Sequence, residues 1–236
     1  MSPAVTMTTN AVPALATVFS ALAALAPATS RADGVDYPLE VGAAWTYHLH
    51  QEIGPGVQFA PDVAPLAHGN RVEMTVICRV VAYERIRGDE YARVESTRNG
   101  HPYFVEWYRT DADGLYLGRT IDLDSGETTE LNPPERFLNA TLRRGESWNW
   151  RSSATPVSST TQVHSPERMK TPAGSFDTTM VVTDMRLGEP PQQVRVQARR
   201  WFVPGTGFAK LDTDSSVAGR RLVHVVLTLE RFEPAR

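Results

Sequence analysis

Apolar and polar residues alternate along most of the chain after residue 35. The clearest alternation covers residues 70–84, in which every second residue is apolar: Val72, Met74, Val76, Cys78, Val80 and Ala82. Successive side chains of a strand point to opposite faces, so this run predicts a long strand that buries one face. Shorter patterns predict further strands over 91–97, 103–108, 115–119, 158–164, 178–185, 193–203, 208–211 and 222–232.

Turn-forming residues separate these strand patterns. Residues 87–89 (Arg-Gly-Asp) and Asn99-Gly100 predict hairpin turns, because such residues tolerate a positive φ. Residues 53–69 are expected to form a long loop and residues 165–176, with two prolines, a connector. Asn132-Pro133-Pro134 is expected to break the chain, and one short helical turn is expected within 135–144.

Short strands between Gly-rich and Pro-rich turns are typical of all-β proteins. The pattern therefore predicts a curved antiparallel sheet that forms a half-barrel or a sandwich, with few or no helices after the N-terminal segment. Several strands also carry large apolar residues on their second face, which favours a second sheet, a lid or a bound apolar ligand. These residues are Ile77, Val81, Tyr83, Trp107, Trp201, Val226 and Phe232.

One pattern occurs twice in the chain. Residues 39–47 read Leu-x-x-Gly-x-x-Trp-x-Tyr, and residues 142–150 read Leu-x-x-Gly-x-x-Trp-x-Trp. Each copy predicts a tight turn into a strand whose two aromatic residues share one face. We therefore expect a single β domain over 33–236 that consists of two related half-units meeting near 131–141.

The first 32 residues predict a secretory signal peptide. Residues 11–27 are apolar and uncharged but short for a membrane span, which needs about 20 residues. Ser30 and Ala32 place small residues at the −3 and −1 positions of a cleavage site, although residues 1–10 hold no Lys or Arg. We expect a periplasmic or secreted protein without a membrane span in the mature chain. A retained N-terminal anchor is the alternative.

Composition excludes some partners and some chemistry. The formal net charge is −3 and no block of basic residues occurs, which argues against nucleic acid as a partner. Cys78 is the single cysteine, so an internal disulfide is excluded, and its apolar strand context predicts a buried, unreactive thiol.

Motifs of enzymes are absent from the sequence: it contains no Gly-x-Ser-x-Gly, Walker loop, dinucleotide fingerprint or His-Glu-x-x-His. His48-x-His50 is the strongest metal candidate, with His224 or His101 as a third ligand, but two ligands rarely suffice and a solvated face explains the pair. The acidic segments 111–114 and 122–126 are interpreted as turns. We expect no metal and no cofactor, and no catalytic residue is nominated.

Three motifs resemble those of an exported bacterial family of β-rich proteins of unknown function. They are the pattern of residues 39–47, Pro-Ala-Gly-x-Phe at 172–176, and Trp-Phe-x-Pro-Gly-x-Gly-Phe-x-Lys at 201–210. The last departs from the family pattern at Val203, Thr206, Phe208 and Ala209. The motif residues, to which we assign a structural role, are Gly42, Trp45, Tyr47, Gly145, Trp148, Trp150, Pro172, Gly174, Phe176, Trp201, Phe202, Pro204, Gly205 and Gly207.

The resemblance implies a fold similar to the half-barrels of lipoprotein carriers of the LolA and LppX kind, with a concave apolar face. We therefore expect an exported, non-enzymatic envelope protein that binds an apolar or lipid-like ligand, or a protein partner, on a curved sheet. A structural or assembly module without a ligand is the alternative, and a hydrolase with scattered carboxylates is third. The motif at 201–210 also predicts a positive φ at Gly205 or Gly207.

Overall fold

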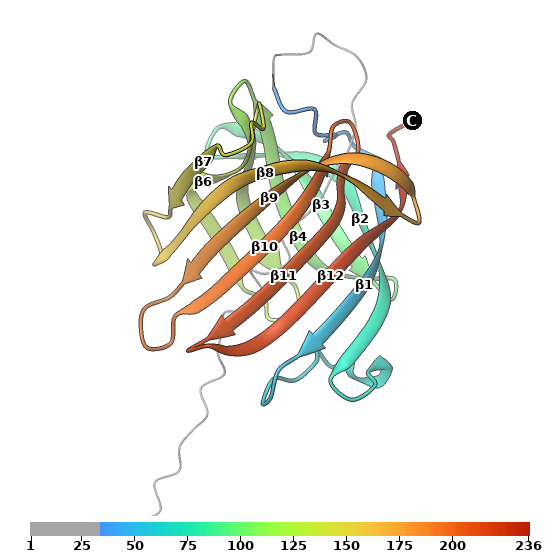
Figure 1. The fold of residues 1–236 in the computed structure, drawn as a ribbon, viewed down its shortest axis with the longest axis vertical. Coiled ribbons are helices and arrows are strands. Elements are labelled where there is room, and N and C mark those ends of the chain that lie inside the picture. The colour runs from blue at the N-terminus through green and yellow to red at the C-terminus, as the bar shows by residue number, and fades with distance from the viewer. Residues whose placement is uncertain (1–33) are drawn as a thin grey trace, which may run out of the picture.

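Twelve strands form one antiparallel sheet that curls into a nearly closed barrel (Figure 1). The computed structural model describes residues 34–236, so the predicted signal peptide, residues 1–32, lies outside the described residues. The strands are β1 (Ala44–Ile53), β2 (Arg71–Ile86), β3 (Asp89–Arg98), β4 (His101–Asp111), β5 (Gly114–Asp122), β6 (Thr128–Asn139), β7 (Ser147–Arg151), β8 (Val157–Thr171), β9 (Gly174–Leu187), β10 (Val194–Val203), β11 (Gly207–Val217) and β12 (Arg220–Glu233).

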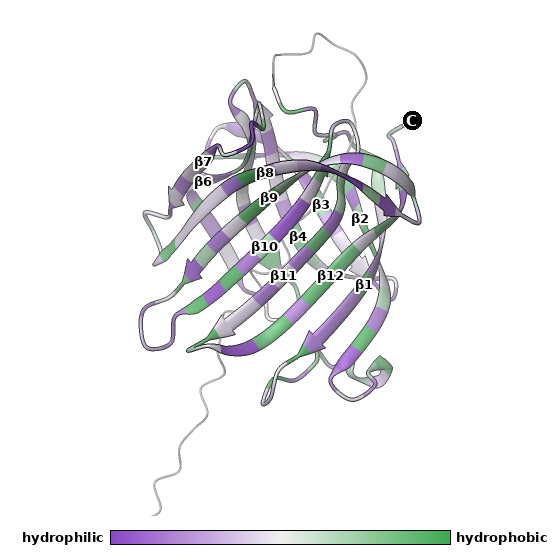
Figure 2. Ribbon diagram, viewed as in Figure 1, coloured by the Kyte–Doolittle hydropathy of each residue, from purple (hydrophilic) through white to green (hydrophobic). Residues whose placement is uncertain are grey.

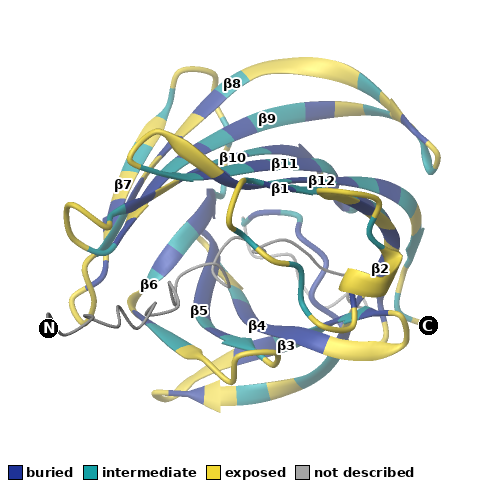
Figure 3. Cartoon of the chain, turned by 90° about the horizontal axis from the view of Figure 1, so that it is seen from below, coloured by how far each residue is buried: buried dark blue, intermediate teal, exposed yellow. Residues whose placement is uncertain are grey.

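The strand order explains the barrel. Every strand pairs with its neighbour in the chain except β6 and β7, and β1 pairs with β12, so the sheet runs from β6 through β1 and β12 to β7. Viewed from below, the strands form a ring around the interior (Figure 3). The prediction of an all-β protein with a curved antiparallel sheet is confirmed, and the sheet curls further than a half-barrel. The described chain adds one 3₁₀ turn, η2 (Ala64–Leu66).

Alternation places the apolar residues inside. In β2, the five residues from Val72 to Val80 at every second position are buried, and the residues between them are exposed. The pattern fails at Ala82 because the register of β2 and β3 shifts between Val80 and Ala82. Green and purple segments alternate along most strands for the same reason (Figure 2).

Two segments form strands where the sequence predicted none. The expected chain break at Asn132-Pro133-Pro134 lies within β6, and the expected connector at 165–176 is the end of β8 and the start of β9. The expected helical turn at 135–144 is instead the end of β6 and the bend after it. The predictions of the break and of the connector were wrong for one reason. Proline is tolerated in edge strands and at bulges: β6 is an edge strand, and a register shift precedes Pro166 in β8.

The predicted hairpin turns are confirmed. Arg87 and Gly88 have φ values of 52° and 96°, and Asn99 and Gly100 have values of 50° and 79°. Two successive positive values suit the right-handed twist of the paired strands.

Candidate functional site

The wall of the barrel is interrupted between β6 and β7, which are the two ends of the sheet. Side chains take the place of a backbone ladder there. The indole of Trp148 donates to the Arg136 carbonyl at 2.8 Å, and the indole of Trp150 donates to the Pro133 carbonyl at 2.9 Å. The backbone N–H of Ser153 donates to the Asn132 carbonyl at 2.7 Å. We call this junction the β6–β7 seam.

A buried ionic cluster lies behind the seam. Ser159 of β8 donates to the Glu135 carboxylate of β6 at 2.8 Å, and Arg200 of β10 donates to Thr183 of β9 at 2.9 Å. Burial raises the pKa of Glu135, while the hydrogen bond from Ser159 and the charge of Arg200 oppose that rise. Burial lowers the pKa of Arg200, and Glu135 is the main opposing influence. Burial therefore disfavours the charged form of both groups, and the charge of each only partly offsets this effect on the other.

A second carboxylate belongs to the same interior. Glu106 of β4 is fully buried and accepts a hydrogen bond of 2.8 Å from the Tyr108 hydroxyl. Burial and the negative charge of Glu106 raise the pKa of Tyr108 well above its ordinary value. The sequence analysis missed Glu106, Glu135 and Arg200. The available signal was a charged residue on the apolar face of a strand, as at Arg200 between Ala198 and Phe202.

Aromatic side chains bridge opposite walls of the barrel. Phe137 of β6 and Phe208 of β11 have ring centroids 6.1 Å apart, and Phe137 also contacts Tyr108 at 5.7 Å. Tyr37, in the segment before β1, stacks on Phe202 at 6.0 Å. At this level the two walls touch through their side chains.

The structure brings two of the predicted motifs together at one end of the barrel. Trp45 of β1 donates to the Thr206 carbonyl at 2.7 Å, and Tyr47 donates to the Phe208 carbonyl at 2.8 Å. Gly205 and Gly207 have φ values of 69° and 100°, so the predicted positive φ is confirmed. A side chain at 207 would also meet the Trp45 indole, since a Cβ there would lie 3.3 Å from its nitrogen.

The other motif residues are more scattered. Pro172 and Gly174 form the tip of the β8–β9 hairpin, where the Ala173 N–H donates to the Leu229 carbonyl at 3.3 Å and Phe176 packs against the core. Trp201 is buried, and its indole donates to Glu167 of β8. The remaining motif residues lie at turns or strand ends: Gly42, Gly145 and Pro204. The contacts of these motif residues are with other parts of the protein.

The metal candidates do not converge on a site. His50 lies 3.2 Å from Glu73, and His48 lies 3.7 Å from the same carboxylate. Across residues 34–236, no group of three or more His, Cys, Asp or Glu side chains is placed to hold a metal ion. His224 contacts Asp212 at 3.1 Å instead.

The remaining candidates behave as the turn and core interpretations predict. The Asp111 carboxylate accepts the backbone N–H groups of Asp113 and Gly114, and Asp122 accepts that of Ser125. Cys78 is buried, and burial raises the pKa of its thiol to about 12. None of the helices in the described part of the chain is long and apolar enough to cross a membrane.

Comparison with known proteins finds a similarity in fold to two solved structures. No protein-family model matches the chain, and no curated protein does. A "putative exported protein with YmcC-like fold" from Bacteroides fragilis and a "putative lipoprotein" from Parabacteroides distasonis each superpose with a TM-score of 0.44 and 13% identity. Each match covers 85% of this chain and 99% of the other. A likeness of this degree carries no conclusion about this chain's function.

Proposed function

We propose that this is an exported, non-enzymatic protein of the cell envelope, periplasmic or secreted, that holds an apolar, lipid-like ligand against the concave face of its barrel. One observation carries the proposal. The concave face is the apolar face, and the wall around it is interrupted at the β6–β7 seam. Trp150 and Leu138 are buried beside the seam, so a ligand that passes it meets apolar surface next to the buried polar cluster of Glu135 and Arg200.

The seam serves as the opening in this proposal on energetic grounds. A backbone ladder ties two strands through a row of hydrogen bonds, each contributing about 0.5–1.5 kcal/mol, and separating them costs the row together. At the seam, β6 is held by four hydrogen bonds to its carbonyls, two of them from Ser153, and by the Ser159–Glu135 bond. Movement of β6 away from β7 therefore breaks fewer bonds than opening a paired junction.

The signal peptide at 1–32 and the kinship to carriers of the LolA and LppX kind belong to this proposal. So does the arrangement of two related half-units, which would comprise β1–β6 and β7–β12. A protein partner from the cell envelope, bound on the curved sheet in place of the lipid-like ligand, is the alternative.

A structural or assembly module without a ligand is the second candidate, and a specific contact favours it. Phe137 and Phe208 meet across the interior, and Arg200 lies 4.2 Å from the Phe137 ring centroid. A ligand that enters at this level must displace these side chains or lie above or below them. A permanently packed interior would leave the barrel as a rigid scaffold.

Native mass spectrometry of the protein purified from the envelope fraction tests the proposal. We expect a bound mass that is lost on denaturation and that extracts into organic solvent. Binding of a fluorescent fatty acid provides the second measurement. Its exchange should be faster in Trp150→Phe, which removes a seam donor, than in Trp201→Phe, which removes an indole donor to Glu167 outside the seam. Absence of both the adduct and saturable probe binding would leave the structural module.

A further inference from the structure

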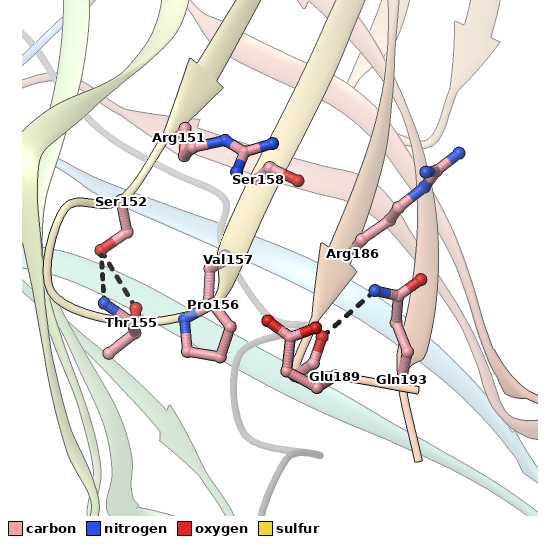
Figure 4. A pocket seen from close by; sticks show the side chains of 10 residues that line it. Arg151, Ser152, Thr155, Pro156, Val157, Ser158, Arg186, Glu189 and Gln193 are labelled. Carbon is pink, nitrogen blue, oxygen red and sulfur yellow. Dashed lines mark hydrogen bonds between the residues drawn. The ribbon is translucent and has the colours of Figure 1, made fainter. Parts of the chain in front are cut away.

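A polar pocket lies at the β7–β9 edge of the sheet, away from the apolar interior. Its volume is about 200 Å³, and the turns that follow β7 and β9 form its walls. A second hollow of about 430 Å³ on the outer face of β7, β8 and β9 adjoins it. The two share three lining residues: Arg151, Ser158 and Arg186. We refer to this pair of hollows as the rim pocket; Figure 4 shows the residues that line the first of them.

The strand register puts the two arginines on either side of one hydroxyl. Arg151 of β7 pairs with Ser158 of β8, and Ser158 pairs with Arg186 of β9. Neighbouring strands are about 4.8 Å apart, so the backbones of the two arginines are about 10 Å apart. Both side chains are exposed, and each is long enough to reach a group bound above Ser158.

Neither arginine is neutralised. Arg195 and Arg221 lie farther along the same outer face, and each forms an ion pair, with Asp184 and Asp214 respectively, at 2.6 and 2.7 Å. Within residues 34–236, Arg151 and Arg186 have no ion pair and no side-chain hydrogen bond, although both line the same hollow as Asp184. Asp184 is thus paired with Arg195. The guanidinium groups of Arg151 and Arg186 keep all their N–H donors available.

The walls of the rim pocket are held in place by hydrogen bonds. The Gly188 N–H, after β9, donates to the Pro156 carbonyl, before β8, at 2.9 Å, which joins the two turns. Ser152 accepts the backbone N–H of Thr155 and the hydroxyl of the same residue at 3.2 and 3.0 Å. Gln193 donates to the Gly188 carbonyl at 3.1 Å. The pocket is therefore formed by tied turns before any ligand arrives, which lowers the entropic cost of binding.

One group opposes an anion. Glu189 lines the rim pocket and forms no ion pair within the described residues. Figure 4 shows its carboxylate beside Gln193, at the β9–β10 end, whereas Arg151 and Ser158 lie at the other end. Arg186 lies on the Gln193 side, but its guanidinium points away from Glu189 (Figure 4), so the positive part of the pocket is the part farther from Glu189.

We propose that the rim pocket binds a phosphate group, with Arg151 and Arg186 as charged donors and Ser158 as a hydroxyl donor between them. A phosphate offers several acceptor oxygens, and the planar guanidinium donates to two of them at once. The group belongs either to a soluble phosphate ester or to a phospholipid headgroup. This site is separate from the apolar interior, so either proposal can fail without the other.

Isothermal titration of the full-length purified protein with glycerol 3-phosphate tests the soluble source, and co-sedimentation with phosphatidylglycerol vesicles tests the headgroup, with phosphatidylcholine vesicles as the comparison. Saturable binding of either probe is expected. Loss of one charged donor should weaken it about tenfold, as in Arg151→Gln or Arg186→Gln, and the double variant should abolish it. Binding of glycerol 3-phosphate alone assigns a soluble ester; preference for the anionic vesicles assigns a headgroup.

Two matched variants make the result specific. Arg221→Gln removes an arginine of the same face that is already paired with Asp214, and should leave the affinity unchanged. Glu189→Gln removes the opposing charge and should tighten binding. The proposal is overturned if neither probe binds, or if the Arg151 and Arg186 variants bind as well as Arg221→Gln. Circular dichroism of each variant separates a lost site from a lost fold.

Discussion

The barrel has two junctions between its first six and its last six strands, and they are held in different ways. At the β1–β12 junction, ten residue pairs run from Ala44–Glu233 to Ile53–Val223 in a continuous ladder with one bulge. At the β6–β7 seam, the indoles of Trp148 and Trp150 donate to the edge of β6. The β1–β12 junction is therefore closed by a backbone ladder, and the seam mainly by side-chain hydrogen bonds.

Both junctions carry the same sequence pattern, Leu-x-x-Gly-x-x-Trp followed by a second aromatic residue, at 39–47 and at 142–150. In the first copy, Trp45 and Tyr47 are buried and donate to the turn before β11 and to its first residues, while the ladder closes the wall independently. In the second copy, Trp148 is half-buried, and its indole N–H donates across the seam to a carbonyl of β6. One local pattern thus fixes the interior at one junction and substitutes for a ladder at the other.

The largest expected effect comes from truncating the two equivalent tryptophans. Trp45→Ala removes a fully buried indole that stacks on Phe232 at 5.4 Å, and should cost about 3–5 kcal/mol of unfolding free energy. Trp148→Ala removes a half-buried side chain and should cost about 1–2 kcal/mol. Urea denaturation of both variants measures the difference. Equal costs would mean that the seam is as deeply packed as the other junction.

The turn before β11 provides the next test of the β1–β12 side. Gly207→Val should destabilise the protein by about 1 kcal/mol or more, because a branched side chain at positive φ is strained. Its Cβ would also press on the Trp45 indole. Gly219→Val is the control: its φ is 77°, and nothing lies within 4 Å of its Cβ. If both variants lose equal stability in denaturant titrations, the contact with Trp45 adds nothing.

The sequence could predict what alternation and turn chemistry encode. The core face of β2, the hairpin at Asn99-Gly100 and the positive φ at Gly207 all follow from local patterns. The extra strand β6 could not be predicted, because Pro133 and Pro134 are excluded only from strands paired on both sides, and whether a strand lies at an edge depends on the whole sheet.

The candidate sites escaped prediction for a related reason. Glu135 and Arg200 are far apart in the chain and influence each other's pKa only because the sheet curls, so neither strand alone reveals the relation. Arg151 and Arg186 are also brought together by register across β8. The tryptophans of the seam were found as a motif, but their role as substitutes for a ladder depends on the missing pairing of β6 and β7.

A smaller effect separates global from local stability. Trp150→Phe and Tyr47→Phe each delete one donor to a carbonyl, and each should cost about 1 kcal/mol. Native-state hydrogen exchange should distinguish them. In Trp150→Phe, amides of β6 and β7 should exchange faster while those of β1 and β12 keep their protection, since the seam opens without global unfolding. Uniform acceleration in Trp150→Phe would show that the seam and the barrel open as one unit.

The smallest expected effect is a pair of opposite pH dependences. Asp62 receives hydrogen bonds from Arg98, which lower the pKa of its carboxyl below 3.8. Its contribution to stability is present above that value and is lost as pH falls through the folded-state pKa. At the seam, the pKa of Glu135 is raised above 4.5, so its contribution is present below 4.5 and is lost as pH rises through the folded-state pKa.

Substitutions at Asp62 and at Glu135 separate the two contributions to the pH dependence of stability. Asp62→Asn should flatten only the acid side of the stability curve, and Glu135→Gln, which keeps an oxygen to accept from Ser159, should reduce the loss of stability as pH rises toward neutral. The exposed Asp177→Asn is the control and should leave the curve unchanged. Denaturant midpoints measured across the pH range report both slopes. Because the charge of Arg200 opposes the rise in the Glu135 pKa, an unchanged pH dependence in Glu135→Gln would mean that the two charges keep the carboxylate ionised despite burial.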